Sequence, residues 1–147
     1  MNELIYAYIK RDLAFSFEAK TSRGPIKTHQ SYLIYVRNKK GEIGWGEAAP
    51  LKGLSIDALP NFEEHLAAIL QNLNEGFSLD ELQLNLFPSI QFAIETAQLD
   101  IENGGNQILF SSAFLKGEAI SINGLVWMAD LEKMYEEAIQ KAQQGFD

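Results

Sequence analysis

The segment SYLIYVRNKKGEIGWGEAAPL, residues 31–51, decides the fold of this chain. Within it, Ser31–Arg37 and Glu42–Ala48 carry the aromatic and β-branched residues that favour strands. The four residues between them, Asn38–Gly41, end in glycine and are typical of a tight turn. The segment therefore predicts an antiparallel hairpin.

A third strand is expected upstream of this hairpin. Glu3–Lys10 contains the same kinds of residue, among them Ile5, Tyr6 and Tyr8. Ser16–Gln30 is polar and includes glycine and proline, which we interpret as excluding a regular element there. We therefore expect three antiparallel strands, with a long first connection and a tight second one.

Helical periodicity follows the strands. One apolar face is formed by Phe62, Leu66, Ile69, Leu70 and Leu73. Ser78–Glu81 has the spacing of a capping box that opens a short helix. A further helix is expected to begin at Pro88 and to stop at Gly104–Gly105, with a buried stripe of Ile90, Ala93, Ile94, Ala97 and Ile101. Strands followed by helices indicate an α+β domain with segregated elements.

The end of the sequence has a different pattern. Ala119–Val126 predicts a strand, and Leu131–Ala142 predicts a strongly amphipathic helix with Asp130 as its N-cap. One strand and one helix are the opening of a βα repeat, and a parallel partner strand is missing from the sequence. We therefore expect the sequence to be part of a longer chain.

Composition excludes several classes of protein. The 147 residues include 12 Lys+Arg and 20 Asp+Glu, a net charge of −8, which disfavours binding to nucleic acid. Cysteine is absent and the two histidines are 36 positions apart, so disulfides, thiolate sites and a histidine cluster are excluded. No apolar run reaches the roughly 20 residues of a membrane helix, and the N-terminus does not resemble a signal peptide. We expect one folded unit in the cytoplasm.

Four segments, in the correct order, resemble the enolase superfamily. Gly44–Leu51 resembles the Gly-x-Gly-Glu-x-x-Pro segment of the muconate-lactonizing subgroup, which also includes mandelate racemase relatives. Phe87–Ala97 resembles the Pro-Ser/Ala-x-x-x-Ala-x-Glu-x-Ala helix of that subgroup. Thr21–Gly24 and Ile122–Met128 resemble the o-succinylbenzoate synthases of the Bacteroidetes type. The resemblance covers essentially the whole chain.

This resemblance implies a domain organisation and a chemistry. Residues 1–105 would form the capping domain, 106–118 a connection, and 119–147 the first strand and helix of an incomplete (β/α) barrel. The complete enzyme would be a lyase that removes water by syn-elimination in menaquinone biosynthesis, with Mg²⁺ holding the carboxylate of a small-molecule substrate. The catalytic lysines and metal ligands of the family would lie beyond Asp147. The chain alone would then hold no metal and be inactive.

The resemblance also nominates substrate-binding residues. They are a flap of Thr21, Ser22, Arg23 and Gly24, a loop of Pro50, Leu51, Gly53, Leu54 and Ser55, and Asn123. Arg23 would donate a charge-assisted hydrogen bond to a substrate carboxylate. The residues alone also fit a solvated loop, a turn and a barrel-interior amide, respectively. We interpret Glu47 and Glu95 as scaffold carboxylates and Trp45 as a packed core aromatic.

Other functions stay open at this point. N-succinylamino-acid racemases, dipeptide epimerases and muconate cycloisomerases share the fold and the metal. A function of another class is a non-catalytic interaction module, in which the apolar face of the tail helix docks a partner chain. We also expect self-association through the incomplete barrel segment, because that face has no cover within the sequence.

Overall fold

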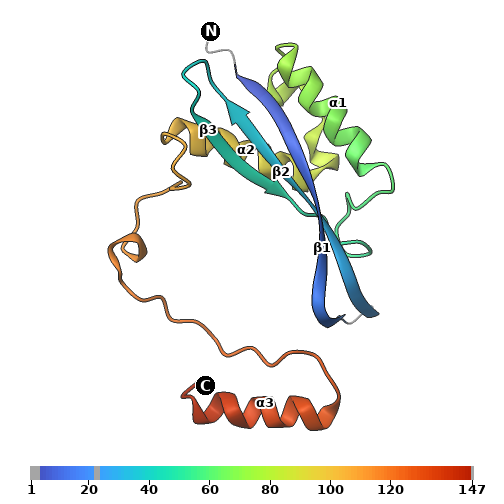
Figure 1. Cartoon of the computed structure of the whole chain (residues 1–147), viewed down its shortest axis with the longest axis vertical. Helices are drawn as coiled ribbons and strands as arrows, with labels where there is room; N and C mark the ends of the chain where they lie inside the picture. Colours follow the sequence, from blue (N-terminus) through green and yellow to red (C-terminus); the bar gives the residue numbers. More distant parts are fainter. Residues whose placement is uncertain (1–3, 22–23, 147) are drawn as a thin grey trace. The chain divides into compact units, whose positions relative to one another are not determined.

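The computed structural model describes residues 4–21 and 24–146. The chain divides into two units, each of which we describe by itself. The first comprises the residues up to Ala14 together with Thr28–Phe110, and the second comprises Phe15–Lys27 together with the residues from Ser111 onward. Figure 1 shows the order of the elements along the chain.

A three-stranded antiparallel sheet forms the centre of the first unit. The strands β1 (Ile5–Thr21), β2 (Gly24–Arg37) and β3 (Ile43–Ala48) are paired in the order β1-β2-β3. In the β2–β3 pair, Ile34 lies opposite Gly46 and Tyr35 opposite Trp45. Gly41 N donates to Asn38 O at 3.0 Å within the connecting turn. The hairpin and tight turn predicted from the sequence are confirmed.

The predicted long connection between the first two strands is wrong. β1 continues to Thr21 and β2 begins at Gly24, so most of Ser16–Gln30 belongs to the two strands. Gly24 has a φ of +113°, which glycine tolerates, and Pro25 sits at the second position of its strand, where a missing N–H costs little. Most of the described side chains here are exposed, so a polar composition is compatible with a strand.

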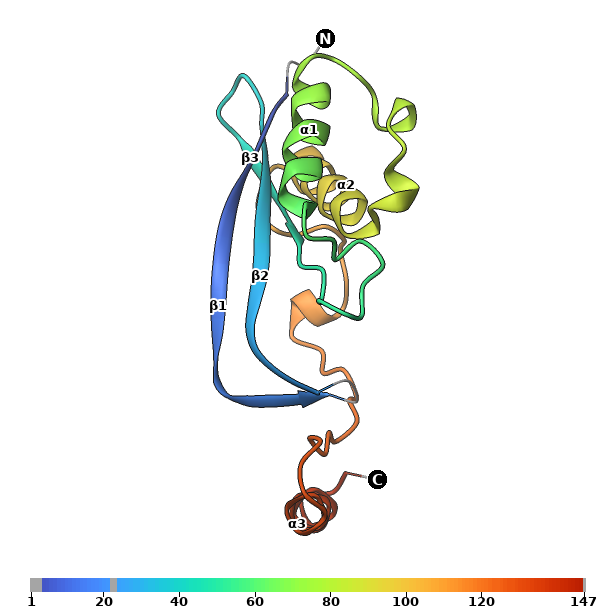
Figure 2. The same ribbon diagram turned by 90° about the vertical axis from the view of Figure 1, so that its right-hand side faces the viewer.

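Two helices cover one face of the sheet (Figure 2). They are α1 (Phe62–Asn74) and α2 (Pro88–Glu102), and both apolar stripes predicted from the sequence are buried. The core between sheet and helices includes Tyr32, Ile34, Val36, Leu66, Ile90 and Ile94. Two 3₁₀ turns, Leu79–Glu81 and Leu84–Leu86, connect the helices. The α+β fold is confirmed.

The backbone of α2 packs directly on β3. A Cβ atom added at Gly46 would lie 1.9 Å from the carbonyl oxygen of Ala93, and one at Gly44 would lie 2.1 Å from that of Ala97. These distances are far below van der Waals contact, so the two glycines let the helix approach the strand. The close approach fixes where α2 lies on the sheet.

The capping box predicted at Ser78 is confirmed. The backbone N–H and the hydroxyl of Ser78 both donate to Glu81 Oε2, each at 2.7 Å. These two hydrogen bonds, the backbone one first, lower the pKa of the Glu81 carboxyl. The box opens the 3₁₀ turn Leu79–Glu81, and not an α-helix.

The tail contains the predicted helix but not the predicted strand. Helix α3 spans Leu131–Gln143, and Lys133 N donates to its N-cap, Asp130 Oδ1, at 3.0 Å. Ala119–Val126 forms neither strand nor helix, and a 3₁₀ turn, Phe114–Lys116, precedes it. A strand needs a hydrogen-bonded neighbour, and in the described residues none pairs with this segment.

Candidate functional site

The tip of the β1–β2 hairpin carries the flap residues predicted from the sequence. Thr21 Oγ1 donates to Gly24 O at 2.7 Å, which links the two sides of the tip. Ser22 and Arg23 lie outside the described residues. In the described residues, Thr21 ends β1 and Gly24, with a φ of +113°, begins β2.

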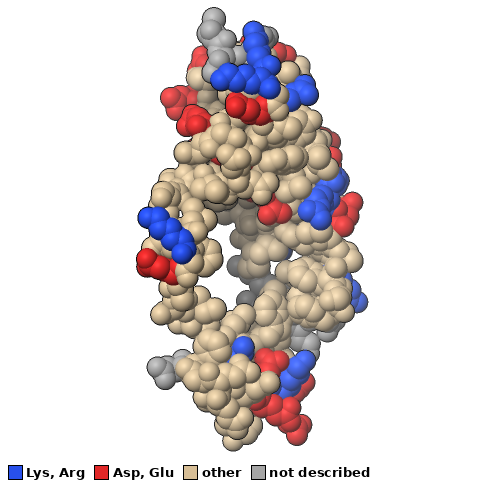
Figure 3. Space-filling model, turned by 60° about the vertical axis from the view of Figure 1, so that its left-hand side comes forward, with Lys and Arg blue, Asp and Glu red and all other residues tan. Residues whose placement is uncertain are grey.

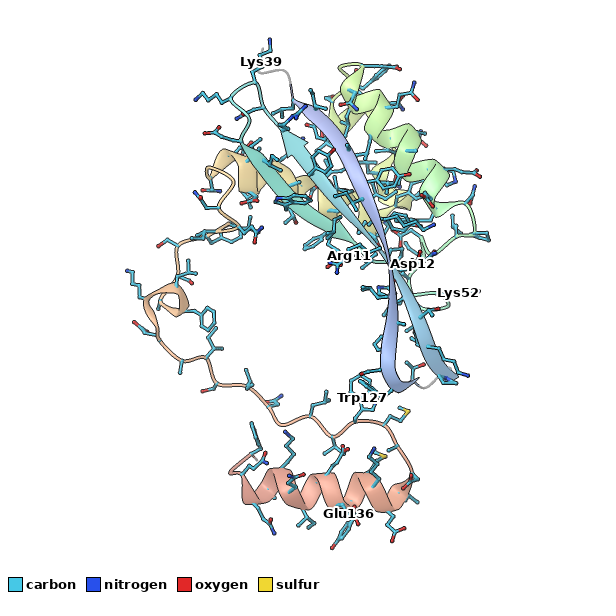
Figure 4. The ribbon with its side chains drawn as sticks, in the orientation of Figure 1. Arg11, Asp12, Lys39, Lys52, Trp127 and Glu136 are labelled. Carbon is cyan, nitrogen blue, oxygen red and sulfur yellow. The ribbon has the colours of Figure 1, made fainter. Side chains whose placement is uncertain are left out.

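Aromatic contacts join the hairpin tip to the C-terminal segment within the second unit. The rings of Phe17 and Trp127 are 5.9 Å apart and nearly perpendicular, at 87°, and the ring of Phe15 lies 6.1 Å from that of Phe17. Figure 4 labels Trp127 in the segment that precedes α3. Trp127 N also donates to Glu137 Oε2 of α3 at 3.0 Å. Sequence reasoning did not assign Phe17 or Trp127 to the site, although Trp127 belongs to the segment Ile122–Met128.

The loop Pro50–Ser55 is the second predicted group, and it forms a closed turn. Leu54 N and Ser55 N both donate to Leu51 O at 2.9 Å, and Leu51 N donates to Ser55 Oγ at 3.0 Å. Gly53 has a φ of +77°. The turn that the sequence predicts is confirmed, and its role as a wall of a substrate site stays a prediction.

Asp57 connects this loop to the helix that packs on the sheet. Its side chain is fully buried, and its carboxylate accepts hydrogen bonds from Ser89 N at 2.7 Å and from Ser89 Oγ at 3.1 Å. Ser89 is the second residue of α2, where backbone N–H groups have no partner within the helix. Sequence reasoning missed Asp57 because its partner lies 32 residues away.

Asn123, the last predicted binding residue, is exposed in the irregular segment before α3. It belongs to the same unit as Thr21 and Gly24, whereas Pro50–Ser55 belongs to the first unit. The predicted residues are thus divided between two units. Their use in a single site stays a prediction.

A mainly apolar depression lies at the β3 side of the first unit. Its volume is about 460 Å³, and its lining includes Leu33, Trp45, Glu47, Thr96, Asp100 and Gln107. Trp45 is half-buried, and its ring lies 5.5 Å from that of Tyr35 at a tilt of 50°, so it is not the packed core aromatic expected from the sequence. Glu47 accepts a hydrogen bond from the buried hydroxyl of Ser31, and Glu95 accepts one from Gln91, as expected for scaffold carboxylates.

Asp100 occupies the floor of this depression. Its carboxylate accepts hydrogen bonds from Trp45 N at 2.9 Å and from Gln107 N at 2.7 Å, and its side chain is 1% exposed. Each of the two carboxylate oxygens therefore accepts a hydrogen bond from a backbone N–H group. We interpret the depression as a structural feature.

Apart from Glu81, the described groups with shifted pKa values lie near the contact of β1 with α1. Burial, followed by the charge of Glu63, raises the pKa of Tyr8, and burial raises that of Tyr32. The hydrogen bond to Glu63, at 2.6 Å, is the main cause of the raised pKa of Lys10. These groups join the sheet to α1, and none of them belongs to the candidate loops.

The described side chains do not form a metal site. Among the side chains that the structure describes, no group of three His, Asp or Glu could hold a metal ion. The buried carboxylates of Asp57 and Asp100 already accept hydrogen bonds.

Acidic and basic side chains are interspersed on the face drawn in Figure 3. In the described part of the chain, no helix is long and apolar enough to span a bilayer.

Two solved structures share the fold of this chain. An enolase family member from Agrobacterium tumefaciens with homology to dipeptide epimerases matches 95% of this chain and 43% of its own, with a TM-score of 0.65 and 16% identity. The o-succinylbenzoate synthase of Thermosynechococcus elongatus, with magnesium in its active site, matches 69% and 30%, with a TM-score of 0.54 and 19% identity.

The chain belongs to the family described as "MenC, N-terminal domain", whose family model matches residues 13–101. An o-succinylbenzoate synthase from Desulfotalea psychrophila is 29% identical over 178 aligned positions, which cover 99% of this chain. These positions make up 48% of that relative, so the chain spans about half of its length. The sequence-based identification of the superfamily and of its o-succinylbenzoate synthase branch is confirmed.

Proposed function

We propose that this chain is the N-terminal part of an o-succinylbenzoate synthase, a lyase that works in the cytoplasm. The observation that carries the proposal is the alignment of 99% of the chain with the Desulfotalea psychrophila enzyme of that name. The match of residues 13–101 to the MenC N-terminal family supports it independently.

In this proposal residues 1–105 act as the capping domain, 106–118 as a connection, and 119–147 as the start of the barrel domain. The hairpin tip Thr21–Gly24, the loop Pro50–Ser55 and Asn123 approach a small-molecule carboxylate, exclude water and orient it. Arg23 supplies a charge-assisted donor. Mg²⁺, the metal named for the Thermosynechococcus elongatus enzyme, binds residues other than those of this chain.

The first prediction tests this division of labour with a chimera. This chain replaces the aligned N-terminal half of the Desulfotalea psychrophila enzyme, and formation of o-succinylbenzoate is followed by its aromatic absorbance. We expect the chimera to form o-succinylbenzoate in the presence of Mg²⁺. The 147-residue chain alone is expected to be inactive, since none of its described groups combines a free base with a metal site.

Two controls make the result specific. A chimera of the same enzyme with the capping domain of a dipeptide epimerase is expected to form much less product. Assays of our chimera with L-Ala-L-Glu test the alternative epimerase activity. A folded chimera that epimerises the dipeptide and forms no o-succinylbenzoate would contradict the proposed function.

The exposed face of α3 favours a second candidate function, an interaction module. Leu131 is 87% exposed and Tyr135 is 68% exposed, and no residue of the helix is buried. Burying one Leu or Ile side chain stabilises by roughly 1.5–3 kcal/mol, which provides a drive for association. In this candidate function the partner is a second copy of this chain, which buries the same face.

We predict that the isolated chain self-associates through α3. Light scattering over a concentration series should give a mass that rises above 16.5 kDa. The variant Leu131→Gln/Ile139→Gln should shift the chain toward the monomer, because both changes remove apolar surface. The matched control Glu132→Gln/Glu136→Gln, on the polar side of the same helix, should not. A wild-type chain that stays monomeric at all concentrations would rule this candidate out.

A further inference from the structure

We propose that Asp57 is a positioning residue, whose buried carboxylate clamps the loop Pro50–Ser55 to the first turn of α2. The clamp holds Leu54 and Ile56 in place as an apolar contact surface for the substrate. The part of this inference that concerns substrate rests on the proposed function, whereas the clamp itself does not.

The clamp has two hydrogen bonds to one residue. Ser89 N and Ser89 Oγ donate to the two different oxygens of the Asp57 carboxylate, at 2.7 and 3.1 Å. The carboxylate lies at the N-terminus of the 15-residue helix α2, where backbone N–H groups are unpaired and a negative charge is favoured. A buried carboxylate that satisfies such donors holds its own backbone in one place.

Short hydrogen-bonded links carry this restraint from Asp57 to the loop. Leu59 N donates to Asp57 O at 2.7 Å, and Ala58 N donates to Ser55 O at 3.2 Å. Ser55 in turn closes the loop by bonding Leu51, through both its backbone N–H and its hydroxyl. Only one residue, Ile56, separates Ser55 from Asp57, so the loop has little freedom once the carboxylate is held.

The loop inverts the usual distribution of polar and apolar side chains. Ile56 is 75% exposed and Leu54 is 43% exposed, whereas Asp57 is fully buried. Solvation alone favours the opposite arrangement. A rigid loop that presents branched apolar side chains outward is suited to contact the apolar part of an aromatic carboxylate, which is the chemical class of the proposed product.

Amide hydrogen exchange on the 147-residue chain tests the clamp. In Asp57→Ala, exchange at Leu51, Leu54 and Ser55 should accelerate at least about tenfold relative to the core of the sheet. Asp57→Asn keeps one acceptor oxygen and should give a smaller acceleration at the same amides. If Asp57→Ala does not fold, Ser89→Ala removes one of the two hydrogen bonds and should accelerate the same amides to a lesser degree.

The matched control is Asp100→Asn, which changes the other buried carboxylate, a partner of β3. It should lower the stability of the chain without a selective acceleration in the loop. Equal acceleration of the loop in both variants, or wild-type exchange in Asp57→Ala, would overturn the clamp.

Kinetics of the chimera described above test the role toward substrate. Asp57→Ala should raise KM about tenfold and change kcat by less than about threefold, since the clamp orients a binding surface and touches no reacting atom. Asp100→Asn should leave KM unchanged. An active chimera whose KM is unaffected by Asp57→Ala would overturn the role in substrate binding. A chimera without activity would contradict the proposed function, while the exchange result would still decide the clamp.

Discussion

Replacing Gly46 with alanine is expected to disrupt the packing of α2 on β3 and to lower the stability of the first unit strongly. The new methyl group would lie 1.9 Å from the carbonyl oxygen of Ala93, which is part of the helix backbone and cannot rotate away. Either α2 must shift along its length or the sheet must bend. Overpacking of this kind costs about 3 kcal/mol or more, a large share of the roughly 5–15 kcal/mol that stabilises a typical domain.

Urea denaturation followed by circular dichroism measures this loss. Gly41→Ala is the matched control, because Gly41 lies in the hairpin turn with no atom within 4 Å of an added Cβ. Its φ of +85° makes alanine unfavourable there by about 1–2 kcal/mol. A Gly46→Ala chain whose denaturation midpoint is at least as high as that of Gly41→Ala would show that the helix can move away at little cost.

The two glycines also illustrate what local sequence reasoning can and cannot give. The segment from Gly44 to Leu51 pointed to the correct superfamily, and strand propensity placed β3 to within one residue. The two glycines leave room for the backbone of Ala93 and Ala97, which belong to a helix about fifty residues later. The spacing of the glycines in the sequence does not reveal this contact. The contact depends on the tertiary position of α2, which no local pattern encodes.

The errors in the strands have a similar cause. The polar composition, glycine and proline of Ser16–Gln30 predict an irregular segment, but a hairpin that is mostly exposed needs no apolar alternation and accepts both residues near its end. The apolar residues of Ala119–Val126 predict a strand, but in the described residues no neighbour pairs with it. In both cases the surroundings of the segment, and not its composition, decide the outcome.

The sequence predicted only the part of the candidate site that a local turn forms. The turn at Pro50–Ser55 follows from proline and glycine at fixed offsets, and the structure confirms it. The residue that holds this turn, Asp57, gave no local signal, because aspartate in a loop is ordinarily solvated. Its burial arises from Ser89, whose unpaired N–H exists only after α2 has formed.

The second large effect is expected at Asp100, which joins three parts of the first unit. Its carboxylate accepts from Trp45 N on β3 and from Gln107 N in the segment after α2, while its own backbone belongs to that helix. Asp100→Leu keeps the branching at Cγ, adds volume, and removes both acceptors. Each unpaired backbone donor costs about 1–3 kcal/mol, so the loss of stability should approach that of Gly46→Ala.

Asp100→Asn separates the hydrogen bonds from the packing. The amide keeps one acceptor oxygen, and its NH₂ group faces the other backbone donor, so the loss should be about half that of Asp100→Leu. Trp45 itself reports on the change, because in a Trp127→Phe background it is the only tryptophan of the sequence. Urea unfolding followed by its emission should give midpoints in the order wild type, Asp100→Asn, Asp100→Leu. Equal midpoints for all three would mean that water replaces the carboxylate at the β3 edge, and that α2 is held by its apolar packing and the glycine contact without it.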